Sequence, residues 1–177
     1  MAHKKSWREK LADSEDLPRV GKIDDKKSKR WGTGTFVIPA PREVDEIMRR
    51  VPKGKLITIN EIRKILAKKH GATIGCPITT GIFAWIAANA AEEAAAEGKK
   101  RVTPYWRTLK TGGELNPKYP GGIENLKRRL ESEGHKVAKK GKANKYIVAD
   151  YKKSMVKTET AAFQSGYERS AKSDRKK

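Results

Sequence analysis

The apolar residues of this chain are concentrated between Pro39 and Asp150, and this distribution limits a buried core to the middle of the sequence. Over the 177 residues, 36% are hydrophobic and 35% are charged, which is close to the boundary below which a chain cannot bury enough apolar surface to fold. This length allows one ordinary domain with flanking tails. We therefore expect a domain at 39–150, a basic N-terminal arm at 1–38 and a basic, disordered tail at 151–177.

The charge of the chain points to a polyanionic partner. Lys and Arg number 41 against 21 Asp and Glu, so the formal net charge is +20. The single cysteine, Cys76, excludes an internal disulfide and a site with several thiolate ligands, and no metal or cofactor is expected. The N-terminus has no apolar signal stretch, and no apolar run reaches the roughly 20 residues of a membrane span. These features are typical of a cytoplasmic, nucleoid-associated protein.

Helical periodicity predicts four helices in the central segment. The first covers 41–51, the second follows a Thr58–Glu61 capping box, the third runs over 77–98, and the fourth covers 123–134. The third helix is rich in Gly and Ala, which lets it approach another surface closely. Two helices joined by a short Gly-containing connector predict a helix-turn-helix whose second helix enters a DNA groove, whereas an Ala-rich helix buried in a core is the alternative.

The rest of the central segment is expected to lie on these helices. Residues 99–122 contain three prolines and a Gly-Gly turn, which predicts a loop with one short strand. KVAKKGKANKYIV predicts a β-hairpin with a basic turn at Lys140 and Gly141, similar to the wing of a winged-helix domain. The predicted fold is therefore mainly α, of the helix-turn-helix or winged-helix-like class, with a short β-hairpin.

The order of these elements, with a P-x-x-R loop at Pro104 and a Y-x-G-G turn at Tyr119, resembles the DNA-binding C-terminal domain of the O6-alkylguanine-DNA alkyltransferases. It is especially similar to their non-enzymatic relatives, the alkyltransferase-like proteins. The resemblance covers about residues 42–137. It implies a helix-turn-helix in the minor groove and a pocket that accepts a flipped alkylguanine. The pocket residues that it implies are Pro104, Tyr105, Trp106, Arg107, Tyr119 and Glu133.

Two departures from the family pattern bear on the chemistry. Tyr105 and Trp106 stand where the family has its acceptor Cys and its His, and a phenol of pKa about 10 or an indole cannot replace a thiolate and its base. The family's intercalating Arg is also missing, because its position falls near Gly81. Ile82 or Phe83 could act there as an apolar wedge, and a core role is the alternative for both. The resemblance therefore implies binding without alkyl transfer, with the two aromatic rings as walls for a base. The alternative is that Trp106 and Tyr119 fill the core under the proline-rich loop.

Three functions follow as hypotheses. The first is a monomeric, non-catalytic protein that binds duplex DNA, extrudes an alkylated guanine and flags it for nucleotide-excision repair proteins. The second is a general DNA- or RNA-binding protein without damage recognition. The third is an enzyme, either a methyltransferase-like protein using Cys76 or a glycosylase-like protein using Glu133. The expected DNA contacts are Thr79, Thr80, Gly81, Phe83, Lys99, Lys100, Arg101, Lys110, Lys127, Arg128, Arg129, Lys139, Lys140 and Lys142.

Overall fold

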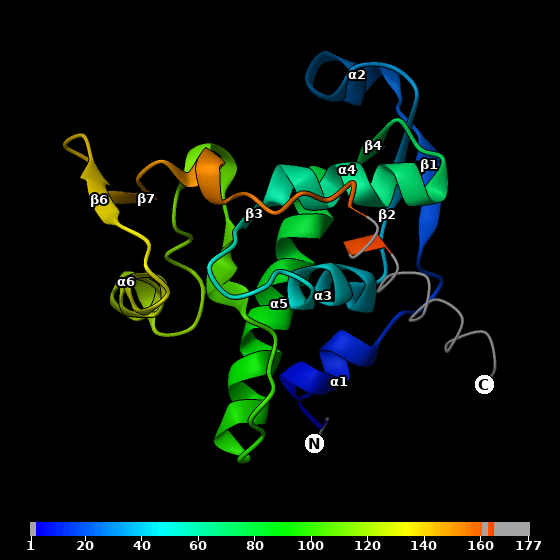
Figure 1. The fold of residues 1–177 in the computed structure, drawn as a ribbon. Coiled ribbons are helices and arrows are strands. Elements are labelled where there is room, and N and C mark those ends of the chain that lie inside the picture. The colour runs from blue at the N-terminus through cyan, green and yellow to red at the C-terminus, as the bar shows by residue number, and fades with distance from the viewer. Residues whose placement is uncertain (1–2, 161–162, 165–177) are drawn as a thin grey trace.

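A computed structural model describes residues 3–160 and 163–164 of the chain (Figure 1). This part is mainly helical and contains three small sheets. The helices are α1 (Trp7–Ala12), α2 (Asp25–Trp31), α3 (Pro41–Arg49), α4 (Ile59–His70), α5 (Pro77–Ala96) and α6 (Gly122–Ser132). The strands are β1 (Arg19–Lys22), β2 (Thr35–Ile38), β3 (Ile57–Thr58), β4 (Ile74–Gly75), β5 (Thr108–Leu109), β6 (Val137–Lys140) and β7 (Lys145–Val148). Single 3-10 turns are η1 (Tyr105–Arg107), η2 (Thr111–Gly113) and η3 (Tyr151–Ser154).

The four helices predicted by periodicity are confirmed as α3, α4, α5 and α6. Their ends follow the expected chemistry. The Thr58 hydroxyl accepts a hydrogen bond from the Glu61 amide at the start of α4, and Gly71 ends that helix in the left-handed conformation at φ +62°. The Glu61 side chain pairs with Lys64.

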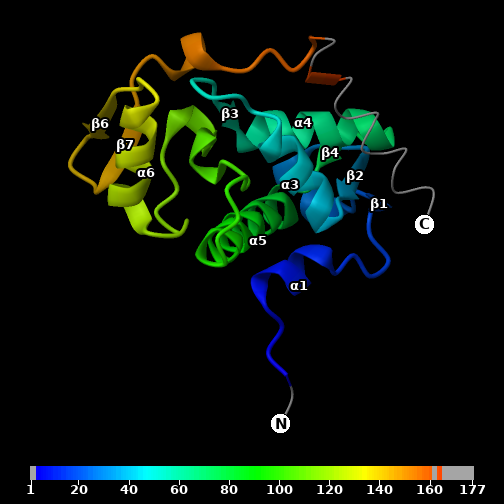
Figure 2. The same ribbon diagram turned by 60° about the horizontal axis from the view of Figure 1, so that its bottom comes forward.

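Helix α5 forms the centre of the molecule, with α3 and α4 packed against it (Figure 2). Its Ala84, Ala87 and Ala88 are fully buried, and so are Ile47 and Met48 of α3. Small side chains on α5 let the larger side chains of α3 fill the space between the two helices. The expectation of a small-residue helix that another element approaches closely is therefore confirmed, on the face of α5 that turns inward.

The N-terminal segment differs from the expected arm, because it contains regular structure that contacts the core. Strand β1 pairs antiparallel with β2, and β2 pairs in parallel with β4. Helix α1 packs on α5, where the Trp7 ring meets the Trp85 ring edge-on at 4.7 Å. These elements are four to seven residues long, too short to display a period in the sequence. Contacts with residues far along the chain stabilise them.

The predicted disorder after Tyr151 is also wrong for the residues that the structure describes. After β7 the chain returns across β3 and α4 (Figure 2). The Leu56 amide donates to the Ser154 carbonyl at 2.9 Å, and the Val156 amide donates to the Leu56 carbonyl at 2.8 Å. Phe163 is buried in the core. The remainder of the predicted tail, at 161–162 and 165–177, lies outside the described residues.

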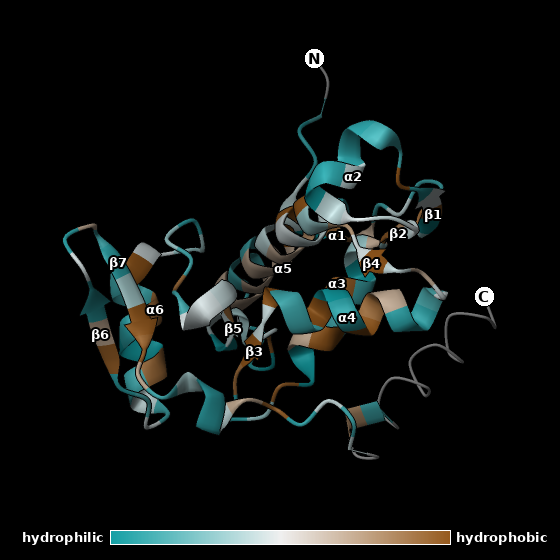
Figure 3. Cartoon of the chain, turned by 90° about the horizontal axis from the view of Figure 1, so that it is seen from above, coloured by the Kyte–Doolittle hydropathy of each residue, from teal (hydrophilic) through white to brown (hydrophobic). Residues whose placement is uncertain are grey.

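The predicted hairpin is confirmed as β6 and β7, which pair from Val137↔Val148 to Lys140↔Lys145. It lies beside α6 at one side of the molecule, whereas the hydrophilic helix α2 stands at another (Figures 1 and 3). The use of this hairpin as a wing on DNA stays a prediction. No helix among the described residues is long and apolar enough to span a membrane. Within the same residues, no group of three or more His, Cys, Asp and Glu side chains could hold a metal ion.

Candidate nucleic-acid interface

The outward face of α5 carries a stripe of exposed apolar side chains. Ile78, Ile82 and Trp85 keep 62%, 46% and 37% of their surface exposed. Their spacing of four and then three residues places them on one side of the helix. Gly81, between them, has open space where a side chain would stand. The first turns of α5 therefore present an apolar surface that is exposed at Ile78 and Ile82 within the part of the chain that the structure describes.

The predicted DNA contacts on α5 do not all share this exposure. Thr80 is fully buried, because its hydroxyl turns inward and donates to the Cys76 carbonyl at 2.6 Å. Phe83 is half-buried against the core. The Thr79 hydroxyl is buried and makes no hydrogen bond to any described residue. Of the predicted contacts on α5, Gly81 alone lies on the open stripe, next to Ile82.

Trp85 is held in place at the edge of this stripe by two other elements. Its indole Nε1 donates to the Lys118 carbonyl at 3.1 Å, and the Trp7 ring of α1 contacts it edge-on. The Lys10 ammonium lies 4.1 Å from the centroid of the Trp7 ring. The apolar stripe therefore ends at an aromatic pair with a positive charge beside it.

Tyr105 lies in the core of the molecule rather than at a surface. It has no exposed surface, and its ring meets those of Trp106 and Tyr119 edge-on, with centroids 5.4 and 5.9 Å apart. Its hydroxyl donates to Glu92 Oε1 at 2.6 Å and accepts from Asn125 Nδ2 at 2.8 Å. Burial and the bond to the Glu92 carboxylate raise the pKa of Tyr105 to about 12. The phenol is therefore fully protonated at neutral pH.

Tyr119 and Pro104 are buried as well. Burial raises the pKa of Tyr119 well above its ordinary value. Because Tyr105 and Tyr119 contact each other and are both covered, no open space separates them for a base in this conformation. Of the residues that the family resemblance places in a pocket, only Trp106, Arg107 and Glu133 retain partial exposure.

Trp106 and Arg107 are both bound to one carboxylate, that of Glu133 at the end of α6. The Trp106 indole Nε1 donates to Glu133 Oε1 at 3.0 Å, and Arg107 Nη2 donates to the same oxygen at 2.7 Å. Arg107 also donates from Nη1 to the Val51 carbonyl at 2.7 Å. Burial alone would raise the pKa of Glu133, but hydrogen bonds from Arg107, Trp106 and the Gly54 amide outweigh it and lower that pKa.

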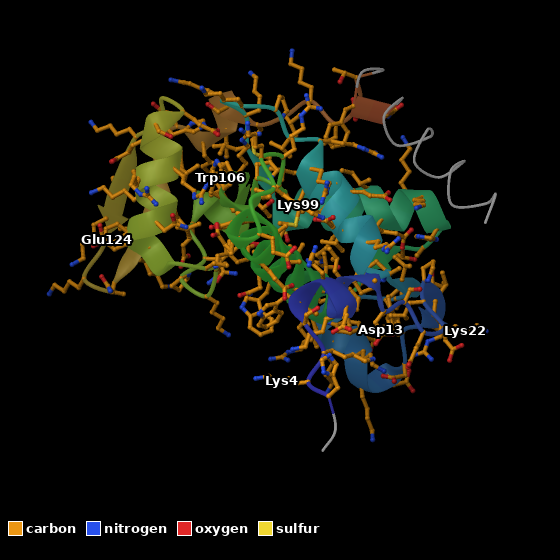
Figure 4. The ribbon with its side chains drawn as sticks, turned by 90° about the horizontal axis from the view of Figure 1, so that it is seen from below. Lys4, Asp13, Lys22, Lys99, Trp106 and Glu124 are labelled. Carbon is orange, nitrogen blue, oxygen red and sulfur yellow. The ribbon has the colours of Figure 1, made fainter. Side chains whose placement is uncertain are left out.

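A second set of bonds connects α5, η1 and α6, and sequence reasoning did not find it. Glu92 Oε1 accepts from Tyr105 and from Arg129 Nη2, and Asn125 Oδ1 accepts from Arg129 Nε at 3.1 Å. Since Asn125 also donates to Tyr105, the four side chains form a closed ring. The Arg129 guanidinium carbon lies 4.4 Å from the centroid of the Trp106 ring. Figure 4 shows Trp106 on the side of the core that faces α6.

The residues that the sequence predicts to contact phosphates are mostly exposed. Those at 99–101 follow the end of α5, and those at 139–142 lie on the hairpin and its turn. Arg129 differs, because it is bound to Glu92 and Asn125 and only 31% of its side chain is exposed. The exposed members of the set are Lys99, Lys100, Arg101, Lys110, Arg128, Lys139, Lys140 and Lys142, with Lys127 half-buried.

Two cavities among the described residues lie away from Tyr105 and Trp106. A cavity of about 530 Å³ opens between α4, β4, η2 and η3 and includes Arg63 and Lys152 in its wall. Another, of about 480 Å³, lies between α1, α3 and α5 and includes Lys99 and Arg101. Neither cavity is lined by a residue that the resemblance places in a base pocket.

The chain matches no known protein-family model and no curated protein sequence. Among solved structures it is similar to the crystal structure of S. pombe Atl1 in complex with damaged DNA containing O6-carboxymethylguanine. The sequence identity is 20% and the TM-score is 0.43, and the similarity covers 66% of this chain and 94% of that chain. A likeness this distant carries no argument about what the chain binds.

Proposed function

We propose that this chain is a non-catalytic protein that binds duplex DNA with the exposed face of α5. The observation that carries this proposal is the open stripe of Ile78, Ile82 and Trp85, which lies on the second helix of a helix pair in a chain of net charge +20. An exposed apolar stripe on a basic protein suits a groove, because apolar side chains can wedge between base steps while basic residues bind the phosphates. Ile82 takes the wedge role in this proposal.

The phosphate contacts come from two exposed basic regions. Residues 99–101 follow the C-terminal end of α5, and residues 139–142 form the hairpin and its turn. Lys and Arg that neutralise phosphates release condensed counterions, so the affinity for DNA falls steeply as salt rises.

The finer part of the proposal is that an alkylated guanine leaves the duplex and stacks on Trp106. Glu133 accepts a hydrogen bond from the indole nitrogen and is itself held by Arg107, which prepares a rigid surface for a base. No alkyl transfer follows, because the Tyr105 hydroxyl, with a pKa of about 12, is a poor nucleophile at neutral pH. In this proposal the bound lesion is passed on to nucleotide-excision repair proteins.

One observation favours a second candidate, a nucleic-acid-binding protein that does not read bases. Tyr105 and Tyr119 are buried against each other, so the site that the family resemblance implies is filled by its own side chains. Such a protein would act through its charge and through the α5 stripe alone.

The groove contact is tested by Ile82→Glu with Val20→Glu as its matched control. Both residues keep 46% of their surface exposed, but Val20 lies on β1, outside the helix pair. We expect Ile82→Glu to weaken binding to a plain duplex by about tenfold or more, because a carboxylate would face phosphates. Val20→Glu should bind like the parent. Equal weakening by both variants, with unchanged thermal unfolding, would refute docking through α5.

Base reading is tested by titrating two labelled duplexes, one plain and one with a single O6-methylguanine, at two salt concentrations. We expect the parent to prefer the modified duplex and Trp106→Leu to lose that preference. Trp106→Leu is chosen over Tyr105→Ala, because emptying the fully buried site of Tyr105 would destabilise the core. Equal binding of both duplexes with a steep salt dependence would establish the second candidate.

A further inference from the structure

Arg129 covers Trp106 in the conformation of the free protein. Its guanidinium carbon lies 4.4 Å from the centroid of the Trp106 ring and 5.7 Å from that of Tyr105. With 31% of its side chain exposed, Arg129 lies at the boundary between the indole and solvent. A base that stacks on this face of Trp106 needs the space that the guanidinium occupies.

We infer that Arg129 is a lid on the base site, held closed by Glu92 and Asn125 and displaced by a base that stacks on Trp106. This inference rests on the proposed function, since it names the residue that controls entry to that site. It assigns Arg129 a role in selecting the base, where the sequence indicated only a phosphate contact.

The bonds around Arg129 allow it to leave without disrupting the core. When it moves, it gives up one bond to Glu92, one bond to Asn125 and its contact with the ring. Glu92 still accepts from the Tyr105 hydroxyl, and Asn125 still donates to Tyr105 and to the Pro120 carbonyl. The inner half of the network therefore stays intact, and the motion is confined to one side chain at the surface.

The displaced guanidinium has a new partner on a DNA duplex. An Arg fork binds a phosphate with two parallel hydrogen bonds, which replace the two that it loses to Glu92 and Asn125. A base must therefore supply enough stacking energy to replace the contact between Arg129 and the indole. A base that remains paired in the duplex cannot do so, and the lid then stays closed.

The test measures the affinity for the O6-methylguanine duplex divided by that for the plain duplex. Loss of a phosphate contact that exists in both complexes weakens both duplexes alike and cancels in the ratio. For Arg129, two bonds to a phosphate in the open state replace the two to Glu92 and Asn125 in the closed state, so the ratio reports its contact with the indole. We expect Arg129→Ala to raise the ratio about two- to tenfold, as loss of a cation–π contact would. The matched control is Arg128→Ala, which also removes an Arg that donates to Asn125 Oδ1 on α6. It should leave the ratio unchanged.

A second variant and a second readout keep the inference testable if Arg129→Ala does not fold. Glu92→Gln keeps an acceptor for Tyr105 but removes the negative charge that holds Arg129, so the ratio should rise in the same direction by a smaller factor. Without DNA, acrylamide quenching should increase for Trp106 in both variants. Because the chain has four tryptophans, the signal of Trp106 is obtained by subtracting the signal of a matched protein that also carries Trp106→Phe.

The possible results separate the lid from the proposed function. An unchanged or lower ratio in both variants, while the parent still prefers the modified duplex, overturns the lid and leaves base reading in place. A ratio of one in every protein overturns base reading and the lid together, whereas duplex binding through α5 is judged by Ile82→Glu. Increased quenching with no binding to either duplex would confirm the closed lid and refute the proposed function.

Discussion

At the scale of single residues, Glu133 holds Trp106 and Arg107 together. One carboxylate, 6% exposed, receives hydrogen bonds from Arg107, Trp106 and the Gly54 amide. Glu133→Gln removes the charge and leaves the Arg107 guanidinium, which is 14% exposed, without its counter-charge. We expect the free energy of unfolding to fall by about 2 to 3 kcal/mol, measured by urea denaturation.

The matched control for this substitution is Glu61→Gln. Glu61 pairs with Lys64, whose side chain is 73% exposed, so its loss should cost at most about 1 kcal/mol. Similar losses in the two variants would show that the Glu133 cluster contributes no more than a surface ion pair.

Glu133 also predicts how stability changes with pH. Its pKa is lower in the folded chain than its ordinary value of 4.5, so its contribution is complete above about pH 4.5 and disappears as pH falls through the folded pKa. The difference in unfolding free energy between the parent and Glu133→Gln should therefore shrink from pH 7 to pH 3. A difference that stays constant over this range would mean that the carboxylate titrates normally in the fold.

The residues of this site were only partly predictable from the sequence. The grouping of Trp106, Arg107 and Glu133 follows from the resemblance to the alkyltransferase motifs, and the structure does bring these side chains together. The burial of Tyr105 and the contact of Arg129 with Trp106 had no signal in the sequence. They depend on where α6 packs, and Arg129 and Glu92 are 37 residues apart in the chain.

At the scale of secondary-structure elements, buried and exposed positions of α5 differ in the size of side chain that they accept. Ala88 on the inner face is fully buried, whereas Ala96 at the end of the helix is exposed. Ala88→Leu should lower the free energy of unfolding by about 1 to 3 kcal/mol, because the added methyl groups have no space in the core. Ala96→Leu, the same change at an open site, should be within about 0.5 kcal/mol of the parent. Thermal or urea unfolding of both variants measures this contrast, and equal effects would contradict the packing described for α5.

Periodicity identified the helices that are long enough to bury one face, and it failed for the shorter elements. Helices α3 to α6 repeat their apolar residues over nine residues or more. Strands β1 and β2 have four residues each, and β1 is largely exposed. Their order depends on pairing with each other and with β4, which no local pattern encodes.

At the scale of the whole molecule, the excess of 20 positive charges predicts the salt dependence of DNA binding. Each phosphate that is neutralised contributes about 0.9 to the slope of log affinity against log salt. Replacing Lys139, Lys140 and Lys142 together by Gln should therefore lower that slope by about 2 to 3, as measured by titration at several salt concentrations. A slope equal to that of the parent would exclude the hairpin from the interface.

The control for the hairpin variant is a triple substitution of Lys27, Lys64 and Lys153 by Gln. Each of these lysines is already paired with a carboxylate three residues earlier, namely Asp24, Glu61 and Asp150. Their replacement removes the same formal charge but should change the slope less, because those ammonium groups have a counter-charge within the protein.

The path of the chain after β7 connects the hairpin to the segment before α4. The strand pair is joined on one side to the loop before α6 through the Leu115 amide and the Tyr146 carbonyl. On the other side, residues 154–156 are bonded to Leu56, directly before β3 and the start of α4. In the proposed complex, a force that DNA exerts on the hairpin would reach the start of α4 through these hydrogen bonds.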